Sequence, residues 1–233
     1  MGTLEKIVAN HQPNYFPWLG YFNKIYKSDT FVFLDDVQYP RTSSGNVVNR
    51  CKILCNGEAK WLTCSINKPS SLAKISQLQI KDGIKSKNFE KLKQYYKKSP
   101  FFKEVIDFLE ELMLFEDKNL SAYNINAIKK ICQKLGIDRE FILQSSLNTQ
   151  MAKEDLMIEI TKKVGGTIYL SGNGARAYQK EENFKKQDLE LIYQEFKPKE
   201  YPQIGAKDFV AGLSIIDTLF NVGFAGTKEL ITA

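Results

Sequence analysis

The stretch from Ile7 to Asp36 constrains the fold of this chain more than any other. It begins with a short apolar run, Ile7 to Ala9, which predicts a buried strand. A second run, Thr30 to Leu34, is almost unbroken, as is typical of strands that a parallel sheet buries on both faces. Between the two runs, apolar side chains recur at spacings of three and four, which predicts a short helix: Trp18, Tyr21, Phe22 and Ile25.

Polar side chains follow both predicted strands directly. His11, Gln12, Asn14 and Tyr15 come after the first strand, in a loop that two prolines stiffen, and Asp35 and Asp36 come after the second. Ligands of open α/β sheets bind outside the carboxyl ends of the strands. We therefore expect His11 and the two aspartates to share one rim of the sheet.

Strands and helices alternate again in the last hundred residues. This pattern predicts further strands at Glu140 to Gln144, Thr167 to Leu170 and Leu189 to Phe196, and helices at Lys153 to Val164, Ala175 to Gln187 and Leu213 to Asn221. Together with the first two strands, they predict an α/β fold with a Rossmann-like, largely parallel sheet. The strands near Ile7, Phe31, Ile142, Ile168 and Leu191 should all lie in it.

The middle of the chain follows another pattern. Two strand-like runs, Val47 to Leu54 and Trp61 to Ile66, flank Asn56-Gly57, which is a strong hairpin signal. Three helices are predicted after them, at Phe89 to Lys97, Pro100 to Phe115 and Leu120 to Leu135. We expect residues 1–233 to form a single α/β domain, with 47–135 inserted as a β-hairpin and helical cap. The polar loop from Gln38 to Asn46 is a candidate lid.

Composition narrows the class of protein. The 233 residues are 43% hydrophobic, enough for a sizeable core, and the net charge of +6 favours anionic ligands. The four cysteines do not have the density of a disulfide framework, so a cytoplasmic protein with reduced thiols is expected. No apolar run approaches the length of a transmembrane helix, about eighteen residues, and no basic stripe with interleaved aromatics indicates nucleic-acid binding.

Several long motifs carry a resemblance to a known family: HQPNYFPWLGYFNKI, FVFLDDVQY, Asn49-Arg50, YLSGNGARAY and FVAGLSIIDTLFNVG. In these motifs the chain resembles the WbqC-like family, which is named from bacterial surface-polysaccharide gene clusters. The resemblance implies a role in O-antigen or related polysaccharide biosynthesis. Its most concrete form is acyl or aminoacyl transfer to a nucleotide-linked amino sugar. ATP with Mg²⁺ as the activating cosubstrate stays open, as does the oligomeric state.

The predicted catalytic residues are His11, Asp35 and Asp36. His11 is the only histidine, which excludes a histidine-cluster metal site but permits acid–base catalysis or a hydrogen bond to phosphate. A purely structural histidine is the alternative. The aspartates suit a sugar hydroxyl, a divalent cation or the orientation of a basic side chain. Adjacent strand residues point to opposite faces, so at most one enters the site, and a structural cap of the strand end is the alternative.

The predicted substrate-binding residues form a larger set. Arg50 offers a bidentate fork for phosphate or carboxylate, with an ion pair to an aspartate as the alternative. The glycine-rich turn after Leu170 can present backbone N–H groups to an anion, or be a simple tight turn. The complete set is Gln12, Asn14, Tyr15, Lys24, Gln38, Asn49, Arg50, Ser171, Gly172, Asn173 and Gly174. We expect His11, Asp36, Arg50 and Ser171 to converge on one cleft.

Two other functions remain open at this stage. The layout of strand, histidine loop, helix and strand is similar to that of nucleotidyltransferases, in which a HIGH-like motif holds ATP phosphates. Here the second histidine of that motif is missing, and Gly20 stands too far along the chain. A protein that binds nucleotide sugars or carbohydrates without turnover is the other alternative, and it would keep Arg50 and the aromatic side chains.

Overall fold

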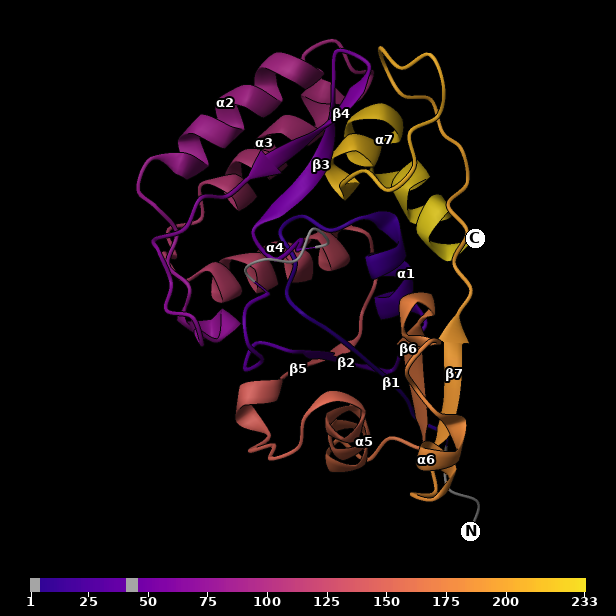
Figure 1. Ribbon diagram of the computed structural model, residues 1–233. Helices are drawn as coiled ribbons and strands as arrows, with labels where there is room; N and C mark the ends of the chain where they lie inside the picture. The colour runs from indigo at the N-terminus through magenta and orange to yellow at the C-terminus, as the bar shows by residue number, and fades with distance from the viewer. Residues whose placement is uncertain (1–4, 41–45) are drawn as a thin grey trace. The chain divides into compact units, whose positions relative to one another are not determined.

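The structure is a computed structural model that describes residues 5–40 and 46–233, in two compact units (Figure 1). The first unit comprises the residues up to 12, together with 23–36 and 138–197. The second comprises 13–22, 37–137 and 198–233. Part of the predicted lid, 41–45, lies outside the described residues. The single-domain assignment stays a prediction.

The first unit contains a five-stranded parallel sheet. Its strands, in chain order, are β1 (Ile7–His11), β2 (Thr30–Phe33), β5 (Glu140–Leu143), β6 (Ile168–Gly172) and β7 (Glu190–Gln194). All five predicted strands are therefore in one sheet, and the predicted fold class is confirmed. Every residue of β2 is buried, as its unbroken apolar run requires.

The order of the strands across the sheet is β5-β2-β1-β6-β7. From β1 the chain runs outward through β2 to β5, then returns to place β6 on the other side of β1 and β7 beyond it. The direction of winding thus reverses between β1 and β6. This topological switch point is where doubly wound sheets bind their ligands.

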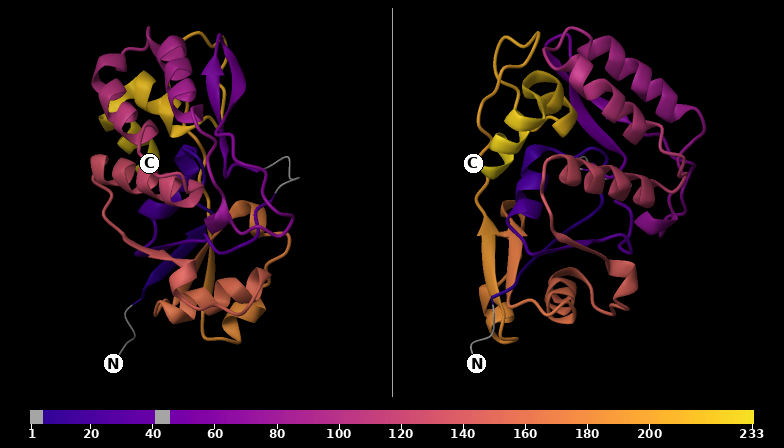
Figure 2. Two further views of the ribbon diagram at one scale, coloured as in Figure 1. Left: turned by 90° about the vertical axis from the view of Figure 1, so that its left-hand side faces the viewer. Right: turned by 180° about the vertical axis from the view of Figure 1, so that it is seen from behind.

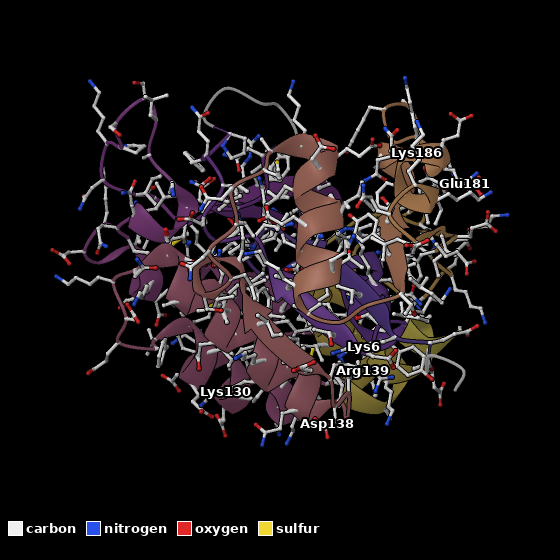
Figure 3. The ribbon with its side chains drawn as sticks, turned by 90° about the horizontal axis from the view of Figure 1, so that it is seen from below. Lys6, Lys130, Asp138, Arg139, Glu181 and Lys186 are labelled. Carbon is white, nitrogen blue, oxygen red and sulfur yellow. The ribbon has the colours of Figure 1, made fainter. Side chains whose placement is uncertain are left out.

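The helices of the first unit are α5 (Lys153–Lys163) and the short α6 (Glu181–Lys185), with the C-terminal half of α1 (Leu19–Tyr26). Tyr169 of β6 stacks on Phe184 of α6, with ring centroids 5.4 Å apart. Polar contacts lie at the N-terminal ends of the strands: Lys6 pairs with Glu140 at 3.1 Å, and Arg139 donates to the carbonyl of Tyr26. Lys6 and Arg139 lie near each other in Figure 3.

The second unit contains the predicted hairpin, β3 (Arg50–Cys55) and β4 (Glu58–Thr63), paired antiparallel. Its turn residues Asn56 and Gly57 have φ values of 52° and 82°. Two successive positive φ values are those of a type I′ turn, whose twist matches that of the strands. The Asn-Gly signal is therefore confirmed.

The α-helices of the second unit are α2 (Ile84–Tyr96), α3 (Phe102–Met113), α4 (Leu120–Lys134) and α7 (Ile215–Thr232), together with the N-terminal half of α1. The C-terminal helix α7 packs on α3 and β3 (Figure 2). All four cysteines are buried free thiols in the structure. Within the described ranges, no helix combines the length and apolarity needed to cross a bilayer.

Three predicted helices have clearly different bounds in the structure. The helix expected at Phe89 to Lys97 already begins at Ile84, as α2. The helix expected at Ala175 to Gln187 is confined to α6, and a 3-10 turn over Asn173–Ala175 replaces its beginning. Glu154 of α5 accepts hydrogen bonds from Lys180 N (2.7 Å) and from Asn183 Nδ2 (2.5 Å), which anchor the start of α6 to α5. The helix expected to end at Asn221 continues to Thr232 after a kink at Gly223, where φ is 69°.

Candidate functional site

The C-terminal ends of β1 and β6 are the first candidate site. β1 pairs with β2 as far as His11 and Phe33, and β6 pairs with β7 as far as Gly172 and Gln194. The pairing of β1 with β6, however, ends at Ala9 and Leu170. The last two residues of both strands are thus beyond the shared ladder, and we call His11, Gln12 and Ser171 to Gly174 the switch-point edge.

Lys24 places a buried cation next to this edge. Its side chain is in the last turn of α1, only 5% of its surface is exposed, and Nζ donates a 3.0 Å hydrogen bond to the carbonyl of Asn10. Among the described residues, no carboxylate forms an ion pair with it. Burial lowers the pKa of Lys24 to about 8, so the amine still carries a proton at pH 7.

His11 is neutral in this environment. Burial and the positive charge of Lys24 lower its pKa from 6.5 to about 4, against an opposing contribution from the carbonyl of Gln12. That carbonyl lies 3.1 Å from Nδ1, which favours the tautomer with the proton on Nδ1. Nε2 is then the nitrogen with the lone pair, so it can accept a proton or a hydrogen bond.

Three polar residues near this edge were not among the predicted site residues: Asn10, Tyr169 and Gln179. Asn10 is 3% exposed, and its Oδ1 accepts a 3.2 Å hydrogen bond from the Tyr169 hydroxyl. Its Nδ2 is buried and has no hydrogen-bond partner among the described residues. Ser171 donates to Oε1 of Gln179 at 2.5 Å. An asparagine and a tyrosine inside otherwise apolar strands were the only signals in the sequence.

Asp35 and Asp36 follow β2, as predicted. Asp35 is buried, and both of its oxygens accept hydrogen bonds from Ser145, from N at 3.0 Å and from Oγ at 2.6 Å. This arrangement is the strand-end cap described above as the alternative, and it joins the ends of β2 and β5. Asp36 is half-buried. The catalytic role of the pair stays a prediction.

A divalent cation would need several oxygen ligands together. No group of three or more His, Cys, Asp or Glu side chains in the described part of the chain is arranged to hold a metal ion. Asp35 already accepts two hydrogen bonds from Ser145, which leaves fewer lone pairs for a cation.

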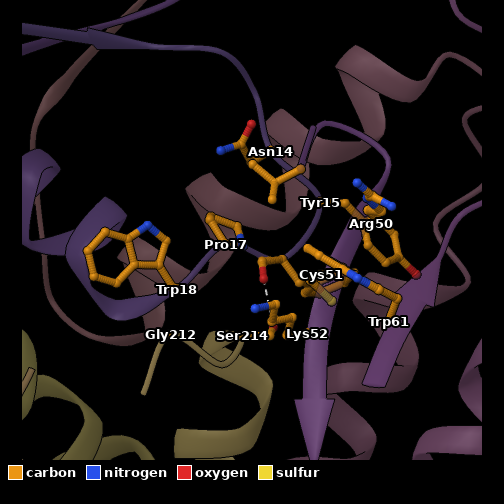
Figure 4. Close-up of a pocket in the computed structure, with 12 residues that line it drawn as sticks. Asn14, Tyr15, Pro17, Trp18, Arg50, Cys51, Lys52, Trp61, Gly212 and Ser214 are labelled. Atoms are coloured by element: carbon orange, nitrogen blue, oxygen red, sulfur yellow. Dashed lines mark hydrogen bonds between the residues drawn. The ribbon is translucent and has the colours of Figure 1, made fainter. Parts of the chain in front are cut away.

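The remaining predicted residues belong to the second unit. Asn49 is part of a buried hydrogen-bond cluster, where it accepts from Tyr39 Oη at 2.9 Å and donates to the carbonyl of Cys64 at 3.1 Å. Gln38 donates to the carbonyl of Ser71. Asn14, Tyr15 and Arg50 line a cavity of about 330 Å³ within this unit (Figure 4). Because Arg50 and His11 belong to different units, their predicted convergence stays a prediction.

The fold and the switch-point edge define an α/β protein with a Rossmann-like parallel sheet and a polar strand-end site. The chain belongs to the WbqC-like protein family, whose model matches residues 12–229. It is also similar to the uncharacterized protein Rv1507c of Mycobacterium tuberculosis (strain ATCC 25618 / H37Rv), with 30% identity over 224 residues that cover 94% of each chain. No solved structure matches it. The resemblance inferred from the motifs is thus confirmed.

Proposed function

We propose that the chain is an enzyme of bacterial surface-polysaccharide biosynthesis, such as that of O-antigen, which transfers an acyl or aminoacyl group to a nucleotide-linked amino sugar. The observation that carries the proposal is Lys24, a buried ammonium without a carboxylate partner among the described residues. Membership of the WbqC-like family supports the biosynthetic context, because the family is named from such gene clusters.

A buried charge is retained at a cost to stability unless something compensates it. The diphosphate of a nucleotide sugar would supply the missing negative charge, and switch points of parallel sheets are common nucleotide sites. Asn10 Nδ2, a buried donor without a partner among the described residues, supports the same ligand class. The glycine-rich turn after β6 adds backbone N–H groups near the same edge.

In the proposed reaction, the amine nitrogen of the sugar attacks the carbonyl carbon of an activated acyl donor. A C–N bond forms, and the C–S bond of a thioester or the C–O bond of an acyl adenylate made from ATP breaks, with the electron pair leaving on sulfur or on phosphate oxygen. Nε2 of His11 accepts the proton that the amine loses and returns it to the leaving group or to water. A bound diphosphate would offset the charge of Lys24 and so raise the pKa of His11 toward the working range.

The test combines binding and turnover. Calorimetry with UDP-linked amino sugars should show that Lys24→Met weakens binding by roughly tenfold or more, as loss of a charged hydrogen bond predicts. Lys27→Met is the matched control, because Lys27 lies close to Lys24 in the sequence, directly after α1, and is exposed. Mass spectrometry with acyl-CoA, or with an amino acid, ATP and Mg²⁺, should detect the N-acylated sugar. Equal affinity of Lys24→Met and wild type would contradict the proposal.

A non-catalytic nucleotide-sugar-binding protein is the second candidate. The specific observation in its favour is the pKa of His11, which at about 4 makes the free imidazole a weak base at neutral pH. Binding that depends on Lys24 without any acylated product from a panel of donors would favour this candidate. The nucleotidyltransferase alternative is not favoured by any observation on the described residues. His11 is followed by Gln12 and Pro13, which match a HIGH-like motif only loosely.

A further inference from the structure

The cavity of the second unit has a composition of its own. Both tryptophans of the chain, Trp18 and Trp61, line it, and so do the cations Arg50 and Lys52. No carboxylate is among the described residues that line it. We call this cavity the tryptophan pocket. At about 330 Å³ it is within the range of small-ligand sites and matches a ring with a phosphate better than a whole nucleotide sugar.

The indole of Trp18 is exposed and yet held in place. Its exposed fraction is 39%, although large aromatic side chains normally pack into a core. The ring lies against the backbone of Gly20, where a Cβ atom would come within 2.2 Å of a ring carbon. The backbone of Trp18 also bridges to Ser214. An aromatic ring that is held in place and still more than a third exposed can serve as a stacking platform for a planar ring.

The loop that carries Trp18 is strained and over-determined. Phe16 has a φ of 39°, in the left-handed region that non-glycine residues seldom adopt. Segments distant in sequence hold it there: Ser214 Oγ donates to the carbonyl of Phe16 at 2.6 Å, and Tyr15 N donates to the carbonyl of Val47 at 3.1 Å. Strain that the surroundings enforce in this way is concentrated at ligand sites.

The cations lie at another part of the same pocket. The guanidinium of Arg50 stacks over the ring of Trp61, 4.3 Å from its centroid, and its Nε donates to the carbonyl of Asn46 at 2.7 Å. Lys52 Nζ lies 5.4 Å from the same centroid. Figure 4 shows Trp18 on one side of the pocket, with Arg50 and Trp61 on the other. The geometry therefore suits a ligand with a planar ring at one end and an anion at the other.

We infer that the tryptophan pocket binds an adenine nucleotide, with the base stacked on Trp18 and a phosphate held by Arg50 and Lys52. This inference rests on the proposed function for the identity of the ligand, because activated acyl donors carry this group either in coenzyme A or in an acyl adenylate. A transferase needs a donor site as well as an acceptor site, and the switch-point edge is proposed for the acceptor. The shared chemistry is the adenine ring with its phosphate.

Intrinsic fluorescence tests the inference directly, because the only two tryptophans both line the pocket. AMP, ATP and coenzyme A are titrated into the whole protein, with adenosine and ribose 5-phosphate as ligands that lack one half each. We expect saturable quenching by at least one complete nucleotide and roughly tenfold weaker binding of both fragments. Preference for coenzyme A over ATP indicates a thioester donor, and the reverse indicates an adenylate.

Matched variants separate the pocket from the rest of the fold. Lys52→Met should weaken the binding of AMP roughly tenfold. Lys60→Met should leave the affinity for AMP unchanged, because Lys60 is an exposed residue of the same hairpin that does not line the pocket. Gly20→Ala should disturb quenching without removing an aromatic ring. Nucleotide binding that is absent, or equal in Lys52→Met and Lys60→Met, overturns the inference. Lys24→Met is expected to leave AMP binding intact, so failure of the proposed function is distinguishable from failure of this pocket.

Discussion

Lys24→Met should stabilise the protein at neutral pH, which is the opposite of what removal of an ordinary buried contact does. Burial lowers the pKa of Lys24 from 10.5 to about 8. At about 1.4 kcal/mol for each pKa unit, the charged amine costs the folded state about 3 kcal/mol at pH 7. Methionine has a similar length and no charge, but it loses the hydrogen bond to the Asn10 carbonyl, worth about 1 kcal/mol. The net gain is about 2 kcal/mol.

The dependence on pH identifies the cause. The folded-state pKa of Lys24 is below the unfolded value, so between pH 8 and 10.5 the unfolded chain binds more protons and wild-type stability rises with pH. The advantage of Lys24→Met is therefore largest below pH 8 and shrinks as the pH rises. By about pH 10.5 the charge cost is gone, and the lost hydrogen bond leaves the variant about 1 kcal/mol less stable than the wild type. A gain of 2 kcal/mol corresponds to an increase of roughly 4 to 8 °C in Tm for a chain of this length.

Scanning calorimetry at several pH values between 7 and 10.5 measures both effects, with Lys27→Met as the exposed control. The control should shift Tm little at any pH, as is usual for surface substitutions. If Lys24→Met melts below the wild type at pH 7, or if its shift does not change with pH, Lys24 is a structural residue and the reasoning behind the anion site is wrong. A stabilised variant that no longer binds a nucleotide sugar would show that the lysine is kept for function at the expense of stability.

Because the chain has a single histidine, its imidazole can be titrated by NMR without resonance assignment. We expect a pKa for His11 of about 4 in the free protein and a higher pKa both in Lys24→Met and on addition of UDP. A pKa near 6.5 in all three samples would refute the burial argument. Because the folded-state pKa is below 6.5, the same residue should cost stability progressively as the pH falls from 6.5 to about 4, up to about 3 kcal/mol, and urea unfolding of His11→Asn should lack this component. If His11 is the base, His11→Asn should reduce kcat by roughly 10²- to 10⁴-fold with little change in ligand affinity, whereas a variant that melts several degrees lower and binds normally would assign a structural role. Gly223→Ala should lower the free energy of unfolding in urea by more than about 1 kcal/mol, because φ at Gly223 is 69° and a Cβ atom would lie 2.6 Å from the Phe101 ring. An unchanged free energy of unfolding would mean that the kink of α7 relaxes freely.

Local signals in the sequence were sufficient for the elements themselves. The unbroken apolar run of β2 predicted a strand buried on both faces, and Asn56-Gly57 predicted the hairpin, because only a few residue types adopt two successive positive φ values. The alternation of strands and helices predicted one parallel sheet. The position of His11 at a strand end followed from the same pattern.

The state of the candidate site was decided by tertiary structure alone. From the sequence, Lys24 was one candidate substrate-binding residue among several. Its burial without a carboxylate partner among the described residues depends on which segments pack around it. The same holds for the pKa of His11, which follows from desolvation and the Lys24 charge. Periodicity indicates which face of an element is apolar, but not which polar groups a distant segment brings to its end. The pKa of a side chain depends on the water and the charges around it in the folded protein, so the chemistry of the site is determined only when the chain is folded.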